Sequence, residues 1–388
     1  MRRTVQKRLR DFRAPDEAGA EQRAWGVVHA AYVEREPVRR TAPRRRLAIV
    51  PVLSVIVAGL LLSPAGATVG RLITRALGIR HAAPSLSSLP SPGRILVTGP
   101  GGTWTAAADG SLRHLGAWRQ ASWSPRGLYV AVVSHDGLAA VDPRGNVRWS
   151  IARPEVSDPS WFSPTGYRVA YLSAGTLRVV AGDGTGDHPL AADVAGVAPA
   201  WRPGYSFQLA YVTAGNRVVV RDADTRQLMW TAPVSARPRE LLWSGDGRSL
   251  VVVTAHAVLT YVWASGVSRS IRHLPGGGTG EAALSPDGRQ VAVVLGGDEV
   301  AVVPTGAARG GVRQLLAGSG LRDVSFSPNG RWLLVGWPAA DQWVFVRVAG
   351  TARVDAVARI AQQFSPGQAG RAFPRLEGWC CTVQGTAG

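Results

Sequence analysis

The histidines and cysteines are the side chains of this 388-residue chain best suited to metal or nucleophile chemistry. The seven histidines form no His-Glu-x-x-His pattern, and none has a cysteine near it in the sequence, so their spacing excludes the common zinc motifs. No Gly-x-Ser-x-Gly elbow marks a hydrolase nucleophile. We therefore predict a non-enzymatic protein with no catalytic residue, metal site or cofactor.

The two cysteines, Cys380 and Cys381, are adjacent. They leave two alternatives, which are buried free thiols and a vicinal disulfide. Consecutive residues of a strand face opposite sides, so a bond between them would distort a β-ladder. This geometry favours two buried thiols.

A pattern of about twelve residues, centred on a tight turn, recurs six times along the chain at intervals of 39 to 42 residues. The copies are SWSPRGLYVAVV (122–133), WFSPTGYRVAYL (161–172), AWRPGYSFQLAYV (200–212), LWSGDGRSLVVV (242–253), ALSPDGRQVAVV (283–294) and SFSPNGRWLLVG (325–336). Proline presets φ in the turn, and glycine accepts a positive φ where the chain reverses. Alternating apolar residues after the turn predict a strand, and two further Gly- or Asp-containing turns follow in each unit. A period near 40 with four strands per unit is typical of propeller blades.

The number of blades depends on the two ends of this region. Residues 94–115 supply three strands with no inner strand before them. The segment LEGWCCTV (376–383) resembles the inner strand around Trp243, with Trp379 in the place of that tryptophan. We therefore predict that the C-terminal strand completes the first blade. The predicted fold is an all-β, seven-bladed propeller, and a six-bladed ring is the alternative.

These repeats resemble the TolB-like and WD40-like bacterial β-propeller repeat proteins over residues 94–383. The Gly-His and Trp-Asp dipeptides of eukaryotic WD40 repeats are missing, which favours the TolB-like side. The resemblance implies a binding or scaffolding role. An alternative is a propeller enzyme of the lactonase or quinoprotein type, since VVVRDADTRQLMW (218–230) looks like a quinoprotein outer strand.

Acidic residues in the turns of such a propeller have two interpretations. They either ring the mouth of the central channel and bind calcium or hydrogen-bond their own turn backbone, and the second is favoured. The residues concerned are Asp136, Asp183, Asp187 and Asp298.

The uncharged and strongly apolar stretch Leu47–Gly70 predicts a single transmembrane helix. Six arginines lie between positions 35 and 46 and three between positions 71 and 80, which predicts a cytoplasmic N-terminus and an extracytoplasmic C-terminal part. Cleavage as a signal peptide near Ala65-Gly66-Ala67 is the alternative. The predicted divisions are a cytoplasmic basic segment (1–46), the transmembrane helix (47–70), a juxtamembrane Pro/Ser linker not expected to pack (71–93) and the propeller (94–388).

The formal charge of +18 is concentrated at the N-terminus, where residues 1–46 carry 13 basic and 6 acidic side chains. Beside a membrane segment such a block sets topology, so we predict no nucleic-acid binding. Residues 15–36 predict a helix with Trp25, Val28 and Tyr32 on one face. A single helix cannot bury that face, so it either binds a partner or lies on the membrane; a disordered tail is the alternative.

Together these features predict a single-pass protein of the inner (cytoplasmic) membrane of a bacterium. Its extracytoplasmic propeller is expected to bind or sense a protein partner or another ligand. The alternative is a transmembrane regulator that resembles membrane-bound anti-sigma proteins, with the N-terminal helix bound to a cytosolic factor.

Overall fold

The computed structural model of the chain describes residues 83, 85–263, 267–305, 310–366 and 372–381. The predicted transmembrane helix (47–70) and the helix that carries Trp25, Val28 and Tyr32 lie outside these residues. In the described part, no helix has the length and apolar character needed to cross a membrane.

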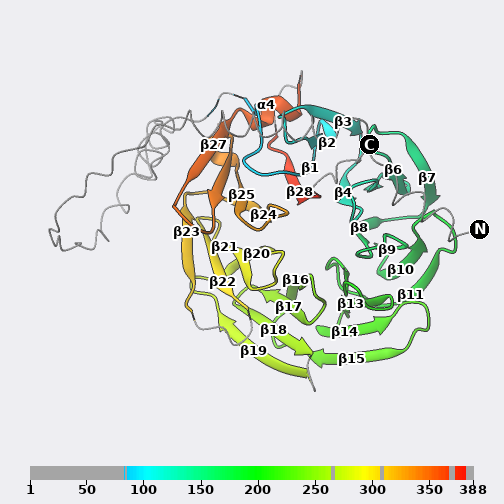
Figure 1. Cartoon of the computed structure of the whole chain (residues 1–388). Helices are drawn as coiled ribbons and strands as arrows, with labels where there is room; N and C mark the ends of the chain where they lie inside the picture. The colour runs from blue at the N-terminus through cyan, green and yellow to red at the C-terminus, as the bar shows by residue number, and fades with distance from the viewer. Residues whose placement is uncertain (1–82, 84, 264–266, 306–309, 367–371, 382–388) are drawn as a thin grey trace, which may run out of the picture. The chain divides into compact units, whose positions relative to one another are not determined.

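Seven four-stranded antiparallel sheets form a ring of blades in the described part of the chain, with one strand of each blade facing the centre (Figure 1). From the inner to the outer strand, blade 1 consists of β28 (Arg375–Cys380), β1 (Arg94–Gly99), β2 (Gly102–Ala106) and β3 (Leu112–Gly116). Blade 2 consists of β4 (Gln120–Trp123), β5 (Val130–Val133), β6 (Gly137–Val141) and β7 (Val147–Ala152). Blade 3 consists of β8 (Val156–Trp161), β9 (Arg168–Ser173), β10 (Thr176–Ala181) and β11 (His188–Ala191).

The other four blades follow the same order from centre to rim. Blades 4 and 5 are β12 (Ala200–Trp201), β13 (Gln208–Val212), β14 (Arg217–Asp222) and β15 (Leu228–Pro233); and β16 (Pro238–Trp243), β17 (Ser249–Thr254), β18 (Ala257–Trp263) and β19 (Val267–His273). Blades 6 and 7 are β20 (Gly278–Leu284), β21 (Gln290–Leu295), β22 (Glu299–Pro304) and β23 (Arg313–Ala317); and β24 (Arg322–Phe326), β25 (Trp332–Trp337), β26 (Gln342–Arg347) and β27 (Val354–Ala358). A 3-10 turn, η1 (Pro338–Ala340), and a short helix, α4 (Ile360–Phe364), complete the elements described. The prediction of an all-β propeller with seven blades is confirmed.

Blade 1 contains both ends of the propeller. Its inner strand β28 pairs antiparallel with β1, and Ile95 lies opposite Trp379. The Trp379 side chain is buried and packs edge-on against Phe345 of blade 7, with the ring centroids 5.6 Å apart. The predicted closing strand is therefore confirmed, and it joins the first and last strands of the propeller in a shared hydrophobic cluster.

The recurring turn explains why serine opens the motif. In blade 6 the Ser285 hydroxyl accepts the N–H of Gln290 (3.0 Å) and donates to the Asp287 carboxylate (2.6 Å), while the Gly288 N–H donates to the Ser285 carbonyl (2.7 Å). Gly288 has φ +69°, as the glycine in the motif predicts. The equivalent turns that begin at Ser244 and Ser327 repeat these bonds. Each turn is therefore held rigidly by its own side chains.

The Pro/Ser linker differs from its prediction. Leu86 and Leu89 are buried against the propeller, in the same cluster as Trp379. The Leu86 N–H also donates to the Gln363 side chain (3.0 Å), and the Ala83 N–H donates to the Ala356 carbonyl (2.9 Å). The expectation that this segment does not pack was wrong for these residues, because the two leucines cover apolar surface between blades 7 and 1.

Candidate functional site

Acidic side chains gather where the seven inner strands meet. In blades 5, 6 and 7 an acidic residue lies four positions before the serine that begins the recurring turn; these are Glu240, Glu281 and Asp323. In blade 1, Glu377 lies four positions before Cys381, which follows the inner strand. Gln120 occupies the same position in blade 2, and Asp158 lies one residue earlier in blade 3. All six line a central cavity of about 590 Å³, together with Arg375. The channel is thus acidic although the whole chain is strongly basic.

Irregular strand pairing places these acidic side chains. The register of the inner strands shifts at Asp158, at Asp323 and at Glu377, so each of these residues has no partner in the ladder. Asp158 and Asp323 also have positive φ values of 54° and 51°. Such bulges turn a side chain away from the regular alternation, and here they direct carboxylates into the channel.

Three of the six channel acceptors form hydrogen bonds that join neighbouring blades. The Gln120 side chain accepts the N–H of Asp158 in the next blade (2.7 Å), and the Glu281 carboxylate accepts the N–H of Asp323 (2.7 Å). Asp323 in turn accepts the N–H of Leu376 (3.2 Å). Each bond joins one inner strand to the next. The backbone groups freed by the bulges are therefore satisfied by the preceding blade.

Crowding and burial raise the pKa values of three channel carboxyls. Burial raises the pKa of Glu240 to about 8, with a further contribution from the charges of Asp158 and Glu281. Burial raises the pKa of Glu377 to about 7 against the lowering effect of its bond from Thr98, and it raises the pKa of Asp323 to about 6. Burial lowers the pKa of Arg375, but the surrounding carboxylates outweigh it and the net shift is upward. Part of the ring is therefore protonated near neutral pH.

The acidic residues singled out in the sequence do not line this channel. Asp183 accepts bonds from the N–H and hydroxyl of Thr185, and Asp298 accepts a weak bond from Gly320, so both act within or beside turns. Asp187 pairs with Arg153 (2.6 Å) and Arg178 (2.7 Å) within blade 3. Asp136 is likewise absent from the channel lining. The described residues contain no group of three or more His, Cys, Asp or Glu side chains placed to hold a metal ion.

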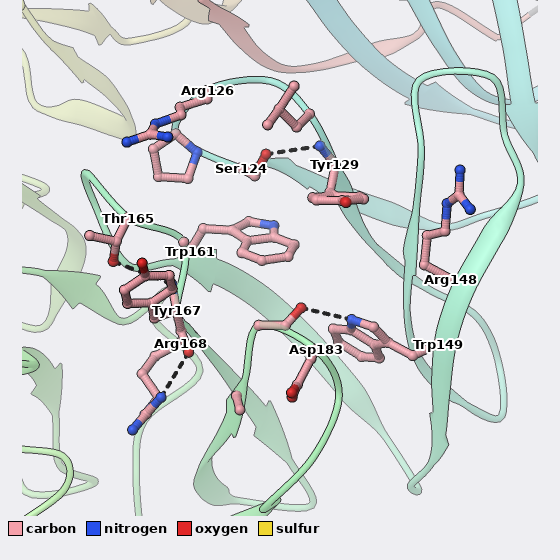
Figure 2. Close-up of a pocket in the computed structure, with 15 residues that line it drawn as sticks. Ser124, Arg126, Tyr129, Arg148, Trp149, Trp161, Thr165, Tyr167, Arg168 and Asp183 are labelled. Carbon is pink, nitrogen blue, oxygen red and sulfur yellow. Dashed lines mark hydrogen bonds between the residues drawn. The ribbon is translucent and has the colours of Figure 1, made fainter. Parts of the chain in front are cut away.

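A second cavity, of about 820 Å³, opens between blades 2 and 3 (Figure 2). We call it the blade 2–3 groove. Five parts of the chain line it: the turn 124–129, the start of β7, Trp161 at the end of β8, the turn 165–168, and residues 181–183. Four aromatic side chains line it: Tyr129, Trp149, Trp161 and Tyr167.

The groove exposes apolar surface that the fold does not use. Tyr167 is 64% exposed, Leu128 58% and Tyr129 41%. The indoles beneath them are fixed, because Trp149 donates to the Gly182 carbonyl (2.9 Å) and Trp161 donates to the Ser122 carbonyl (3.2 Å). Exposed aromatic rings on a rigid base are typical of binding surfaces.

The charges of the groove are unevenly satisfied. Arg148 pairs with Asp142 (2.7 Å), and Arg168 forms a two-pronged pair with Asp224 (3.1 and 2.9 Å). Arg126, on the turn 124–129, has no ion pair among the described residues. The groove therefore offers one unpaired cation beside its aromatic floor.

The cysteines lie close to this groove. The Sγ atoms of Cys380 and Cys381 are bonded to each other, and both residues are half-buried, which differs from the expected pair of buried thiols. The Sγ of Cys381 lies 3.3 Å from the carbonyl oxygen of Pro125, which is part of the groove wall. Within the described part of the chain the Trp379 indole before them has no hydrogen-bond partner, whereas Trp243 donates to the Ala200 carbonyl (3.1 Å).

Two signals in the sequence were missed. Glu240, Glu281 and Asp323 each lie two residues before a copy of the repeat, so extending the repeat by two residues would have found them, and Glu377 lies at the equivalent position within 376–383. The groove has a weaker signal. Only two copies place a tyrosine directly before the strand that follows the turn, Tyr129 and Tyr167, and these two blades are neighbours.

Comparisons with known proteins identify solved structures with a similar fold. No family model matches the sequence, and no curated protein matches it. The structure is similar to that of a putative 6-phosphogluconolactonase from Bacteroides uniformis, with a TM-score of 0.51 and 16% identity over 69% of this chain and 97% of that one. It is also similar to the β-propeller domain of Cps50 (Swd1) from Myceliophteria thermophila, with a TM-score of 0.53 and 15% identity over 66% and 94% of the two chains.

A third similar structure is a functionally unknown protein from Desulfotomaculum acetoxidans, with a TM-score of 0.53 and 14% identity over 75% of this chain and 99% of that one. At these identities the similarity establishes the propeller fold alone.

Proposed function

We propose that this chain is a non-enzymatic binding module, which holds an extended segment of a partner protein in the blade 2–3 groove. The observation that carries the proposal is the exposure of Tyr129 and Tyr167 in a groove that two hydrogen-bonded tryptophans also line (Figure 2). Tyrosine, tryptophan and arginine are the residues that dominate binding energy at protein interfaces.

The chemistry of the groove narrows the partner. Aromatic-lined grooves bind proline-rich segments, because these are already extended and lose little conformational entropy on binding. The unpaired Arg126 favours a segment that also carries a carboxylate. The proposed ligand is thus a proline-rich peptide with at least one acidic residue.

The cellular setting remains the one that the sequence predicts. The uncharged stretch 47–70 supports a single-pass anchor in the inner membrane, and the arginine distribution supports an extracytoplasmic propeller. The Ser-Pro-Asp-Gly turns support a TolB-like relationship. A reporter that is active only outside the cytoplasm, fused after Gly388, should work in the host; activity of a cytoplasm-only reporter there would contradict the topology.

The binding proposal is tested with synthetic peptides. The full-length chain, purified in detergent, is titrated by fluorescence anisotropy with labelled decapeptides that are proline-rich and acidic, proline-rich and neutral, or proline-free and acidic. We expect the first to bind most tightly, and Tyr167→Ala to weaken it at least tenfold. Ile271→Ala, a change of another exposed apolar side chain (43% exposed), is the matched control. Equal binding by Tyr167→Ala, or no preference among the peptides, would reject the groove as their site.

The regulatory alternative rests on Trp25, Val28 and Tyr32, which the structure does not describe. A pull-down with residues 1–46 tests it separately. A cytosolic protein retained by these residues and lost with Trp25→Ala would favour that alternative.

A further inference from the structure

The disulfide at the end of β28 contacts the turn that forms one wall of the blade 2–3 groove. Cys381 Sγ lies 3.3 Å from the Pro125 carbonyl oxygen, and both sulfur atoms lie 3.8 Å from the Ser124 carbonyl oxygen. The same turn carries Arg126, Leu128 and Tyr129 into the groove. The disulfide and the groove thus both contact one short segment.

This turn is packed tightly on its disulfide side. Gly127 has φ +63°, and a Cβ atom built there would lie 3.1 Å from Cys381 Sγ and in direct contact with the Arg94 guanidinium. Arg94 donates to the Gly127 carbonyl and lies over the Trp123 ring at 4.7 Å. The turn therefore lies in direct contact with Cys381 and Arg94, and a movement of the sulfur atoms would disturb these contacts.

Three hydrogen bonds also cross-link the turn internally. The Ser124 N–H donates to the Tyr129 carbonyl (2.9 Å), the Gly127 N–H donates to the Ser124 carbonyl (2.8 Å), and the Tyr129 N–H donates to the Ser124 hydroxyl (2.9 Å). A displacement at the Ser124 and Pro125 carbonyls is therefore passed on to Tyr129 in the groove.

We propose that Cys380–Cys381 is a thiol–disulfide exchange site for dithiols, and that its reduction loosens the turn 124–129 and so alters the blade 2–3 groove. The regulatory part of this proposal rests on the proposed binding function of the groove. Both cysteines are half-buried, and Cys380 lines the central channel, through which a dithiol reaches the bond.

The exchange follows ordinary thiol chemistry. A thiolate of the dithiol attacks Cys380 Sγ, the Cys380–Cys381 bond breaks, and Cys381 leaves as a thiolate that takes up a proton. The second thiol of the dithiol then attacks the mixed disulfide, releases Cys380 as a thiol and closes the oxidised dithiol. Two electrons pass from the dithiol to the protein.

Reduction changes the contact with the turn in two ways. The two sulfur atoms must separate from bonding distance to van der Waals contact, and Cys381 already touches the Pro125 carbonyl. Each thiol also gains an S–H donor that the disulfide lacks. Cys381 has a φ of +55°, a backbone conformation that is unfavourable for a residue other than glycine. Once the S–S bond is broken, the ring that links the two adjacent cysteines is open and Cys381 is free to adopt a negative φ.

The test uses the full-length chain with and without dithiothreitol. Free thiols are counted by mass after alkylation, and hydrogen exchange is followed in the turn 124–129. The equivalent turn of blade 6, residues 285–290, has the same three hydrogen bonds and no cysteine beside it, so it is the internal control. We expect two new thiols and exchange at least ~5-fold faster in 124–129, with 285–290 unchanged.

A Cys380→Ser/Cys381→Ser double variant should not respond to dithiothreitol. Absence of new thiols in the wild type, or new thiols without faster exchange in 124–129, would overturn the proposal. This readout needs no ligand. If the turn responds to reduction but proline-rich acidic peptides bind neither redox form, the proposed function fails and the exchange site stands. If the peptides bind and reduction leaves the turn unchanged, the exchange site fails and the proposed function stands.

Discussion

The central channel and the blade 2–3 groove are both lined by aromatic and charged side chains, yet these side chains have different roles. In the channel, Gln120, Glu281 and Asp323 accept backbone N–H groups from the following blade. In the groove, Tyr129 and Tyr167 stand largely in solvent above tryptophans that are already hydrogen-bonded. Charge and size of a cavity are thus poor guides to function by themselves. What distinguishes the groove is that the fold does not need its exposed groups.

The comparison implies that changes around the channel reduce stability, whereas changes in the groove reduce binding. The largest effect should follow removal of the closing strand. Deletion of residues 374–388 removes β28 and its pairing with β1, and it exposes the unpaired edge of that strand. We expect the cooperative melting transition of the full-length chain, followed by circular dichroism, to be lost. Deletion of residues 385–388 is the control, and a parent-like transition after the longer deletion would contradict the closing role.

Trp379→Ala should have the next largest effect. The side chain is 6% exposed and packs against Phe345, so its loss should destabilise the propeller by about 3–5 kcal/mol. Trp379→Phe sharpens the test. The Trp379 indole has no hydrogen-bond partner among the described residues, whereas Trp243 donates to the Ala200 carbonyl. Trp379→Phe should therefore destabilise the propeller less than Trp243→Phe does. Denaturant unfolding measures both, and equal losses would contradict this reading.

Asp323→Ala should lower the free energy of unfolding by about 1–3 kcal/mol, because the N–H of the half-buried Leu376 loses its acceptor. Asp323→Asn keeps an acceptor and tolerates the positive φ, so it should cost clearly less. The same unfolding experiment compares the two. A loss as large for asparagine as for alanine would mean that charge, rather than the hydrogen bond, matters at this position.

Glu240→Gln should change the pH dependence of stability. The folded-state pKa of Glu240 is about 8, above its ordinary 4.5, so the folded state holds a proton that the unfolded state has lost. The stability of the wild type should therefore fall as pH rises from about 4.5 to about 8, and Glu240→Gln should reduce that fall. Melting temperatures at pH 5, 7 and 9 measure it. Glu155→Gln, at an exposed position, is the control. Parallel pH profiles of stability for Glu240→Gln and the wild type would contradict the raised pKa of Glu240.

The smallest effect on stability should come from the groove. Tyr167→Ala should change the free energy of unfolding by no more than about 0.5 kcal/mol, because the side chain is 64% exposed. It should nonetheless abolish most peptide binding. A destabilisation as large as that of Asp323→Ala would show that the tyrosine supports the fold, and the contrast between the two cavities would no longer hold.

The repeat pattern predicted most of the fold, because each turn encodes its own geometry. Serine, proline and glycine specify one reversal, so Gly288 has the predicted positive φ, and the resemblance of Trp379 to Trp243 located the closing strand. The linker was misjudged because burial of Leu86 and Leu89 depends on surface supplied by distant blades.

The two cavities were harder to predict. The carboxylates of the channel come together only when seven strands converge, and three of them depend on bulges that hydrophobic alternation does not reveal. The groove requires that two neighbouring turns both present a tyrosine. Neither property belongs to a single repeat.

The placement of β28 beside β1 has a consequence for synthesis. The first strands of the propeller, from Arg94 onward, leave the ribosome long before their inner neighbour, which is made after every other strand described. Blade 1 therefore cannot be completed until β28 has been made, and any product that stops before β28 retains an open edge. The ring closes only when β28 pairs with β1, so proteases that recognise exposed strands can distinguish molecules that contain β28 from molecules that lack it.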